Sequence, residues 1–305
     1  MLETRGLTRL FGDIRAVDAV DLTVRPGGLT GFVGGNGAGK TTTMRMIMGI
    51  LEPTAGEVLW RGRPVGRDDR ARFGYMPEER GLYPKQPVLF QLVYLGRLHG
   101  MSARAARRSG HEYLERFGLA DRANDSLESL SLGNQQRVQI AAAVMASPIA
   151  LILDEPFSGL DPDAVDAMAD LMREQAARGV PVLFSSHQLD LVERICDDLV
   201  VLSSGRVVAG GKVEDLRHRG RTLHRLVVAA GPSGATADAG WVRDVPGVAV
   251  VDVDGPVAVL ELVAADASDR LLREALRRGS VRELSTIVPS LSEICLLYTS
   301  DAADD

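Results

Sequence analysis

The sequence has little of several features that identify common protein classes. It has only two cysteines, Cys196 and Cys295, in 305 residues, which excludes a disulfide framework or a zinc-ligand cluster and is typical of a reducing compartment. No segment approaches the roughly 18 uninterrupted apolar residues of a membrane span, and the charged N-terminal segment lacks the apolar centre of a signal peptide. The formal net charge is −6, so the charge balance does not favour nucleic acid as a partner. We therefore expect a soluble, cytoplasmic chain that serves a membrane only through a partner protein.

The sequence does contain a regular alternation of short apolar runs and amphipathic segments. This alternation predicts an α/β fold with a mainly parallel sheet and helices on its faces. The three- and four-residue apolar spacing within residues 84–133 predicts a helical insert in the sheet domain. A basic and then glycine-rich stretch after about residue 217 indicates a change of domain. We expect a first domain over 1–219 and a small α+β accessory domain over 222–294.

A glycine-rich segment, GGNGAGKT at 34–41, fits the pattern G-x-x-x-x-G-K-[ST]. Its glycines would let backbone amides surround a phosphate, while the helix that follows points its positive end at the same group. Lys40 would add a cation for the β- and γ-phosphates, and the Thr41 hydroxyl would ligate Mg²⁺. The alternative is a chance glycine-rich turn, but an apolar strand precedes it and a helix follows it, as the motif requires. The predicted nucleotide contacts are Gly34, Gly35, Asn36, Gly37, Ala38, Gly39, Lys40, Thr41 and Thr42.

Two adjacent carboxylates, Asp154 and Glu155, follow a buried apolar run. In an open α/β sheet, ligands bind at the carboxyl ends of the strands. Asp154 is therefore predicted to hold Mg²⁺, and Glu155 to polarise the water that attacks the γ-phosphate. The alternative, that Asp-Glu-Pro merely ends a strand, is disfavoured by the phosphate loop earlier in the chain.

Three further features allow two interpretations each. His187 follows an apolar strand, and it is either a structural hydrogen-bonding residue or a contact of the γ-phosphate that orients the water. Phe11 is either a core aromatic or a ring that stacks on adenine. The basic segment at 101–110 is either a solvated helix face or a surface close to anionic lipid and to the loops of a membrane subunit. We favour the functional interpretation for His187 and Phe11, and the solvated face for 101–110.

Five motifs occur in order along the chain: GGNGAGKTT, LSLGNQQRV, LILDEP, SGLDP and SSHQ. Together they resemble the Walker A, signature, Walker B, D-loop and H-loop motifs of the ATP-binding subunits of ABC transporters, over about residues 1–217. The resemblance implies a P-loop NTPase fold and two ATPase domains paired head to tail, with each ATP held between them. It implies that Ser131 and Gly133 contact the γ-phosphate bound to the partner and that Asp161 lies at the dimer interface. Phe11 matches the adenine-stacking aromatic of the family.

The sequence departs from the family pattern at three positions. The usual signature is LSGGQ, whereas here Leu132 and Asn134 replace a glycine and the glutamine. Glu78 stands where the family usually has a glutamine; a carboxylate there would still ligate Mg²⁺ or water while adding negative charge beside the γ-phosphate. The segment PEERGLYP together with this signature resembles the sodium-efflux and drug- or peptide-export branch, whose members carry a small C-terminal domain.

We therefore predict the ATP-binding and ATP-hydrolysing subunit of a bacterial ABC exporter, with ATP and Mg²⁺ as cofactors. Its partners would be an integral-membrane permease and a second ATPase subunit, in a homodimer or a heterodimer, on the inner face of the cell membrane. One alternative is a soluble ABC ATPase that acts on ribosomes or DNA, but such proteins usually have two cassettes or a long coiled coil. The other is a non-hydrolytic regulatory module, which the presence of Lys40, Asp154, Glu155 and His187 disfavours.

The last eleven residues, CLLYTSDAADD at 295–305, resemble an in-frame translation of a sequencing-library adaptor. We expect the gene's own reading frame to be cut after about Ile294, in which case Cys295 is not a native residue. The alternative is an ordinary acidic terminus. The codons of this segment distinguish the two.

Overall fold

The computed structural model describes residues 1–79, 81–219, 223–229, 238–264 and 266–287. The chain divides into two compact units: one spans Met1–Val213, and the other begins at Glu214. Segment 295–305, for which we expect an adaptor origin, lies outside the described residues. Within the described ranges, no helix is long and apolar enough to cross a membrane.

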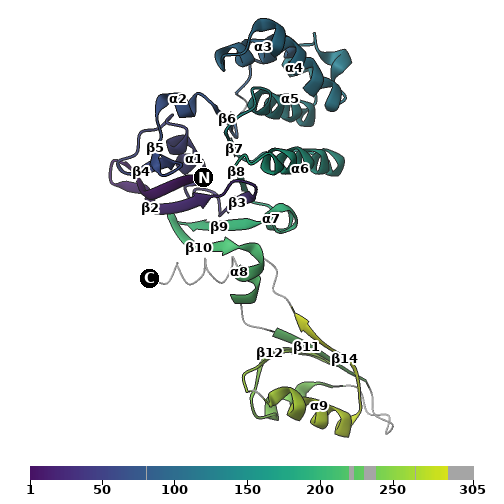
Figure 1. The fold of residues 1–305 in the computed structure, drawn as a ribbon. Helices are drawn as coiled ribbons and strands as arrows, with labels where there is room; N and C mark the ends of the chain where they lie inside the picture. The colour runs from purple at the N-terminus through teal and green to yellow at the C-terminus, as the bar shows by residue number, and fades with distance from the viewer. Residues whose placement is uncertain (80, 220–222, 230–237, 265, 288–305) are drawn as a thin grey trace. The chain divides into compact units, whose positions relative to one another are not determined.

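The first unit is built on a six-stranded sheet in the order β10-β9-β3-β8-β7-β6 (Figure 1). All neighbours run parallel except β10, which pairs antiparallel with β9 at one edge. The central strands are buried along their whole length, which explains their nearly continuous apolar sequence. The strands are β3 (Leu29–Val33), β6 (Phe73–Met76), β7 (Ala150–Leu153), β8 (Val182–Ser186), β9 (Asp198–Ser203) and β10 (Arg206–Lys212).

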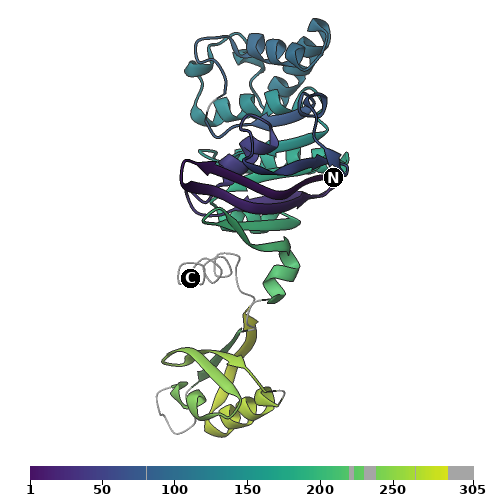
Figure 2. The same ribbon diagram turned by 90° about the vertical axis from the view of Figure 1, so that its left-hand side faces the viewer.

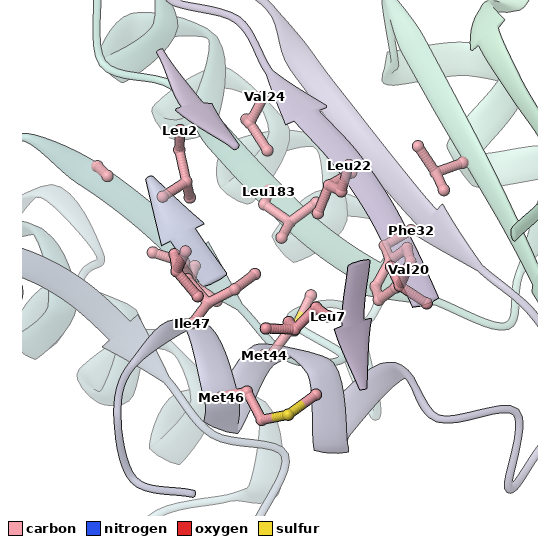
Figure 3. Packing of buried hydrophobic residues seen from close by; sticks show 14 of the residues in the cluster. Leu2, Leu7, Val20, Leu22, Val24, Phe32, Met44, Met46, Ile47 and Leu183 are labelled. Carbon is pink, nitrogen blue, oxygen red and sulfur yellow. The ribbon is translucent and has the colours of Figure 1, made fainter. Parts of the chain in front are cut away.

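A second, antiparallel sheet in the same unit has the order β2-β1-β4-β5. Its strands are β1 (Leu2–Phe11), β2 (Ile14–Val24), β4 (Ala55–Trp60) and β5 (Arg63–Pro64), and Figure 2 shows β1 and β2 as two long adjacent strands. Helix α1 (Lys40–Ile47) contributes Met44, Met46 and Ile47 to the core that this sheet shares with β3 and β8 (Figure 3). Because α1 is packed into this core, its N-terminus is held at a fixed place beside the end of β3.

Three helices form the insert between β6 and β7: α3 (Val88–Leu98), α4 (Ala103–Arg116) and α5 (Leu132–Val144). They pack against one another, and α5 also packs against β6 (Figure 1). The remaining helices of the unit are α2 (Arg67–Arg70), α6 (Pro162–Ala177), α7 (Leu189–Ile195) and the short 3₁₀ turns η1 (Ala120–Arg122) and η2 (Leu127–Ser129). The expected α/β cassette with a helical insert is confirmed.

The second unit contains a four-stranded antiparallel sheet in the order β12-β13-β11-β14. The core of this unit lies between the sheet and one helix, and it includes Leu226, Ala258 and Leu260 of the sheet and Leu271 of helix α9. Its elements are α8 (Val213–Arg219), β11 (Leu223–Ala229), η3 (Gly240–Asp244), β12 (Val248–Asp254), β13 (Val257–Leu262), α9 (Ala267–Arg278) and β14 (Ser280–Ile287). The expected small α+β fold is confirmed.

Candidate functional site

The glycine-rich segment forms a loop between β3 and the N-terminus of α1. The Lys40 ammonium group is buried beneath this loop and donates hydrogen bonds to the carbonyl oxygens of Gly34 at 2.7 Å and Gly35 at 3.2 Å. The first turn of α1 has no side-chain cap, so its amides are free to bind an anion. The loop is thus shaped as a cradle for phosphate.

Two positions in this loop require glycine because the backbone of neighbouring segments lies very close. A Cβ on Gly34 would lie 2.3 Å from the carbonyl oxygen of Leu202. Gly39, at the start of α1, has φ +102°, and a Cβ there would lie 2.6 Å from the carbonyl oxygen of Ala16. Both glycines therefore allow the loop to pack against β2 and the end of β9.

A cavity of about 280 Å³ opens above this loop. It brings together the phosphate-binding loop, Glu78 after β6, and the two carboxylates after β7, Asp154 and Glu155, which lie more than a hundred residues after the loop. Its lining residues are Ala16, Asn36, Gly37, Ala38, Gly39, Lys40, Thr41, Thr42, Glu78, Asp154 and Glu155. Three carboxylates therefore face one buried ammonium group and a helix N-terminus, which is an arrangement suited to a metal–polyphosphate complex.

Asp154 is fully buried and makes one side-chain hydrogen bond. Its Oδ1 atom accepts a bond of 2.6 Å from the hydroxyl of Ser185, whereas its buried Oδ2 atom has no hydrogen-bond partner among the residues that the structure describes. A buried, unpartnered carboxylate oxygen beside a phosphate cradle fits a divalent cation. Among the described residues, no group of three or more His, Cys, Asp or Glu side chains could hold a metal. Such a cation would therefore need oxygens from the nucleotide or from water.

Glu155 is held in a strained backbone conformation directly after Asp154. Its φ is +50°, a left-handed value that is uncommon for a non-glycine residue and costs free energy. Ser185 supports this conformation, because its hydroxyl accepts a 2.8 Å hydrogen bond from the Glu155 amide. The Glu155 carboxylate is nearly buried, and its Oε2 atom lies 2.9 Å from Nδ1 of His187. The structure thus brings together two of the predicted catalytic side chains.

The electrostatic environment of the cavity is visible at Tyr75, at the end of β6. Burial raises the pKa of the Tyr75 phenol, and the nearby negative charge of Asp154 raises it further. The hydrogen bond and positive charge of Arg45 act in the opposite direction. The pKa of Tyr75 is thus sensitive to the negative charge of Asp154, which a divalent cation would neutralise.

The signature segment lies away from this cavity. Ser131 caps the N-terminus of α5, where its hydroxyl accepts a 3.4 Å hydrogen bond from the Asn134 amide. Leu132 is 46% exposed and packs against Gly159, where a Cβ would lie 2.8 Å from Leu132 Cδ2. Asp161 caps α6 by accepting a 2.8 Å bond from the Ala164 amide. Ser131, Gly133 and Asp161 are not among the residues that line the cavity.

The two remaining predicted contacts are both exposed. Glu78, directly after β6 and Pro77, lines the cavity. Phe11 ends β1, and the guanidinium of Arg9 lies 4.7 Å from the centre of its ring. Phe11 is 46% exposed, the Arg9 guanidinium covers one side of its ring, and it is not among the residues that line the cavity.

Sequence reasoning missed three buried polar side chains that hold the site: Ser185, Gln136 and Gln139. Ser185 is the next-to-last residue of β8, which pairs with β7, and its hydroxyl bonds to Asp154 directly after β7. On α5, Gln136 donates to the backbone oxygen of Glu155, and Gln139 donates to that of Pro77, the residue before Glu78. The sequence does show a serine near the end of an apolar strand and two glutamines on the buried face of a helix. Without the strand order, however, neither feature reveals which residues these side chains bond to.

Comparison with known proteins gives a consistent result. The family model described as ABC transporter matches residues 17–158, and the model described as ATP-binding protein DrrA1-3-like, C-terminal domain, matches residues 211–298. The ABC transporter ATP-binding protein YhaQ of Bacillus subtilis (strain 168) is 39% identical over 298 residues, which cover 96% of this chain and 97% of that protein.

Two further relatives match part of the chain. The Nod factor export ATP-binding protein I of Burkholderia lata is 38% identical over 213 residues, covering 69% of this chain and 70% of that protein. A solved structure of the ATP-binding subunit of an ABC transporter is 34% identical, with a TM-score of 0.67, and covers 72% of this chain and 92% of that one.

Proposed function

The chain belongs to the ABC transporter family of ATP-binding proteins, and from this premise we propose that it is the ATPase subunit of an exporter that works as a head-to-tail dimer. The family resemblance inferred from the motifs is thereby confirmed, and the chain is an ATP-binding cassette ATPase.

One observation carries the dimer proposal: the cavity holds the phosphate loop and three carboxylates but not the signature residues. Ser131 and Gly133 stand at the exposed N-terminus of α5, whose amides would bind an anion brought by another molecule. A second ATPase subunit, turned head to tail, would bring its own nucleotide to them. Asp161 would then lie at the interface, and each ATP would be enclosed by two chains.

Within one chain, we assign the nucleotide contacts as follows. The loop amides and Lys40 would bind the β- and γ-phosphates, and Phe11 would stack on the adenine ring. Mg²⁺, when bound, would neutralise negative charge on the phosphate oxygens and orient them. The unpartnered Oδ2 of Asp154 and the Thr41 hydroxyl would hold that ion, and Glu78 would ligate it or one of its waters.

Hydrolysis would use the Glu155–His187 pair. The Glu155 carboxylate would accept the proton of the attacking water, and its φ of +50° fixes the direction in which the side chain leaves the backbone. Because an ionised carboxylate only accepts hydrogen bonds, Nδ1 of His187 would be the donor across the 2.9 Å contact with an ionised Glu155. His187 would thus orient the carboxylate and contact the γ-phosphate region.

The membrane partner would dock on the helical insert. Phe90, Tyr94 and Leu98 are 60%, 46% and 65% exposed, and their spacing of four residues places them on one face of α3. An exposed apolar stripe of this kind fits a partner helix of an integral-membrane permease. We therefore place the chain at the inner face of the cell membrane, bound through that permease.

The exporter assignment rests on relatives, such as the Nod factor export protein, and on the accessory domain. We propose an ATPase domain over about 1–219 and an accessory domain over about 222–294 that belongs to the sodium-, drug- or peptide-exporting branch. The cargo would be selected by the permease.

The test of the dimer proposal is the Glu155→Gln variant of the full chain. Removing the base while keeping the shape of the side chain should lower ATP turnover by at least about a hundredfold and trap an ATP-bound dimer, seen by light scattering. Glu57→Gln, an exposed change on β4, is the matched control and should behave as the unaltered protein. A Glu155→Gln protein that stays monomeric in ATP, or hydrolyses it at the normal rate, contradicts the proposal.

A further inference from the structure

Helix α5 has three buried glutamines, and two of them, Gln136 and Gln139, bond to the segments that follow the catalytic strands. Gln136 and Gln139 are 7% and 5% exposed, and they lie three residues apart, on one face of the helix. Burial of a side-chain amide is costly unless it forms hydrogen bonds. The side-chain amide groups of both glutamines donate hydrogen bonds to backbone oxygens of other segments rather than to α5 itself.

The first glutamine holds the segment after β7. Gln136 Nε2 donates to the carbonyl oxygens of Glu155 at 3.2 Å and Pro156 at 3.3 Å. Glu155 is the residue with φ +50°, so its amide is fixed by Ser185 on one side and its carbonyl by Gln136 on the other. The backbone that aims the Glu155 carboxylate is therefore tied directly to α5.

The second glutamine holds the segment after β6. Gln139 Nε2 donates a 2.7 Å hydrogen bond to the carbonyl oxygen of Pro77, the residue before Glu78. Strands β6 and β7 are neighbours, with Met76 beside Leu153, and the Asp154 amide donates to the Met76 oxygen at 2.8 Å. One face of α5 therefore holds two adjacent strand ends, each of which continues into a carboxylate of the cavity.

The same helix begins at the signature segment. Ser131 is its N-cap and Leu132 its first residue, so the exposed N-terminus lies one turn from Gln136 and two from Gln139. A helix of 13 residues packed against β6, α3 and α4 moves as a rigid element. A displacement of residues 131–133 would then also shift the backbone at Pro77 and Glu155, which are hydrogen-bonded to the helix.

We propose that Gln136 and Gln139 are positioning residues that transmit engagement of the signature segment by a partner's nucleotide to Glu155 and Glu78 in this chain's own cavity. The inference rests on the dimer proposed above and adds to it a route by which one ATP site governs the other. Binding of the partner's nucleotide at residues 131–133 fixes the position of α5. The helix in this position orients the carboxylates of Glu155 and Glu78 for hydrolysis. The two sites of the dimer are consequently coupled.

The decisive variant is Gln139→Met in the full chain, because methionine keeps the size and flexibility of the side chain and removes the donor. Loss of the hydrogen bond between Gln139 and Pro77 should lower kcat by about tenfold, the loss expected for one positioning hydrogen bond. The KM for ATP should stay within about twofold of normal. The Hill coefficient of ATP hydrolysis should fall from above one in the unaltered protein to about one in the variant. Gln136→Met should act in the same direction.

The matched control is Gln175→Met on α6. Gln175 is also buried, but within the described part of the chain its Nε2 atom has no hydrogen-bond partner, so this change makes the same exchange of buried side chains without removing a hydrogen bond to a segment of the cavity. Thermal unfolding of all variants reports whether they fold. Gln139→Glu, which sets a carboxylate against the Pro77 oxygen, provides a second measurement and should reduce kcat at least as much.

The outcomes separate this proposal from the function on which it rests. Transmission through α5 is wrong if Glu155→Gln dimerises in ATP while Gln139→Met keeps the normal kcat and Hill coefficient. It is also wrong if Gln175→Met lowers kcat and the Hill coefficient as much as Gln139→Met does. In both cases the dimer proposal is unaffected. If Glu155→Gln stays monomeric in ATP, both the dimer proposal and the proposed transmission through α5 are contradicted. Dimerisation combined with the loss of kcat and cooperativity only in the Gln136 and Gln139 variants supports the proposal.

Discussion

The hydroxyl of Ser185 donates a 2.6 Å hydrogen bond to Asp154 Oδ1 at the buried ends of the neighbouring strands β7 and β8. The same hydroxyl accepts from the Glu155 amide at 2.8 Å. One side chain thus turns the free Oδ2 of Asp154 in a fixed direction and holds the strained backbone of Glu155.

Replacing Ser185 with alanine should impair catalysis more than nucleotide binding. Asp154 Oδ1 would be left buried without a partner, and both carboxylates would lose their orientation; we expect kcat to fall about tenfold or more, and the Mg²⁺ concentration for half-maximal activity to rise. Steady-state ATPase assays over a Mg²⁺ titration measure both. Ser185→Thr keeps the hydroxyl and should retain most activity, and an alanine variant with an unchanged Mg²⁺ profile would refute the role of Ser185.

The acid sensitivity of the first unit should depend in part on Asp69. Hydrogen bonds from Arg63, and then from the Gly66 amide, hold the pKa of Asp69 below its ordinary value of 3.8. Because the folded-state pKa is depressed, the stabilisation is complete above the unfolded-state pKa and disappears as the pH falls through the folded-state pKa.

We therefore expect Asp69→Asn to lower the unfolding temperature at neutral pH by about 2 °C, a modest shift because the Arg63 side chain is largely exposed. The difference from the unaltered protein should vanish in acid, as measured by calorimetry over a pH series. Asp68→Asn, at an exposed neighbouring site, is the control. A deficit for Asp69→Asn that persists unchanged in acid would contradict the linkage.

The apolar stripe on α3 should be needed for the permease but not for chemistry. Phe90→Ser removes an exposed ring outside the cavity, so the ATPase rate of the isolated chain should stay within about twofold of normal, while binding to the permease weakens at least about tenfold. Co-purification with a tagged permease from the neighbouring reading frames measures the latter. Ile50→Ser, at a similarly exposed residue outside the insert, should leave both unchanged, and equal binding by Phe90→Ser would place the docking surface elsewhere.

The parts of the site that the sequence predicted are those with local signals. Lys40 and Thr41 belong to one contiguous loop between an apolar strand and a helix, and Asp154 and Glu155 directly follow another apolar strand. Each motif carries its own structural context, and strand ends in a parallel sheet converge on one edge. The cavity that unites them was therefore foreseeable without coordinates.

The residues that the sequence did not reveal act across large separations in the chain. Ser185 meets the Glu155 amide 30 residues away, and Gln139 meets Pro77 62 residues away. A serine or glutamine in an apolar segment has no signature of its own, and its partner depends on strand order and helix rotation. The same reason conceals the antiparallel sheet, because the pairing of β1 with β4 joins segments some 50 residues apart.

The central claim is that each ATP site is assembled from two chains, and mixing two inactive variants tests it most directly. Lys40→Ala disables the phosphate loop and Ser131→Arg the signature, so each protein alone should lose at least about a hundredfold in ATPase rate. In a mixed dimer, the intact loop of one chain would meet the intact signature of the other.

An equimolar mixture should therefore regain at most about a quarter of the normal rate, since half of the randomly formed dimers would hold one complete site of two. Coupling through α5 would lower this recovery, because the chain with the intact loop carries the disabled signature, but the rate should still exceed that of the separate proteins. Mixing either variant with the Lys40→Ala, Ser131→Arg double variant should restore nothing, because no complete site forms in that pair. An equimolar mixture of the two single variants whose rate only equals the average of the separate proteins would contradict the two-chain site.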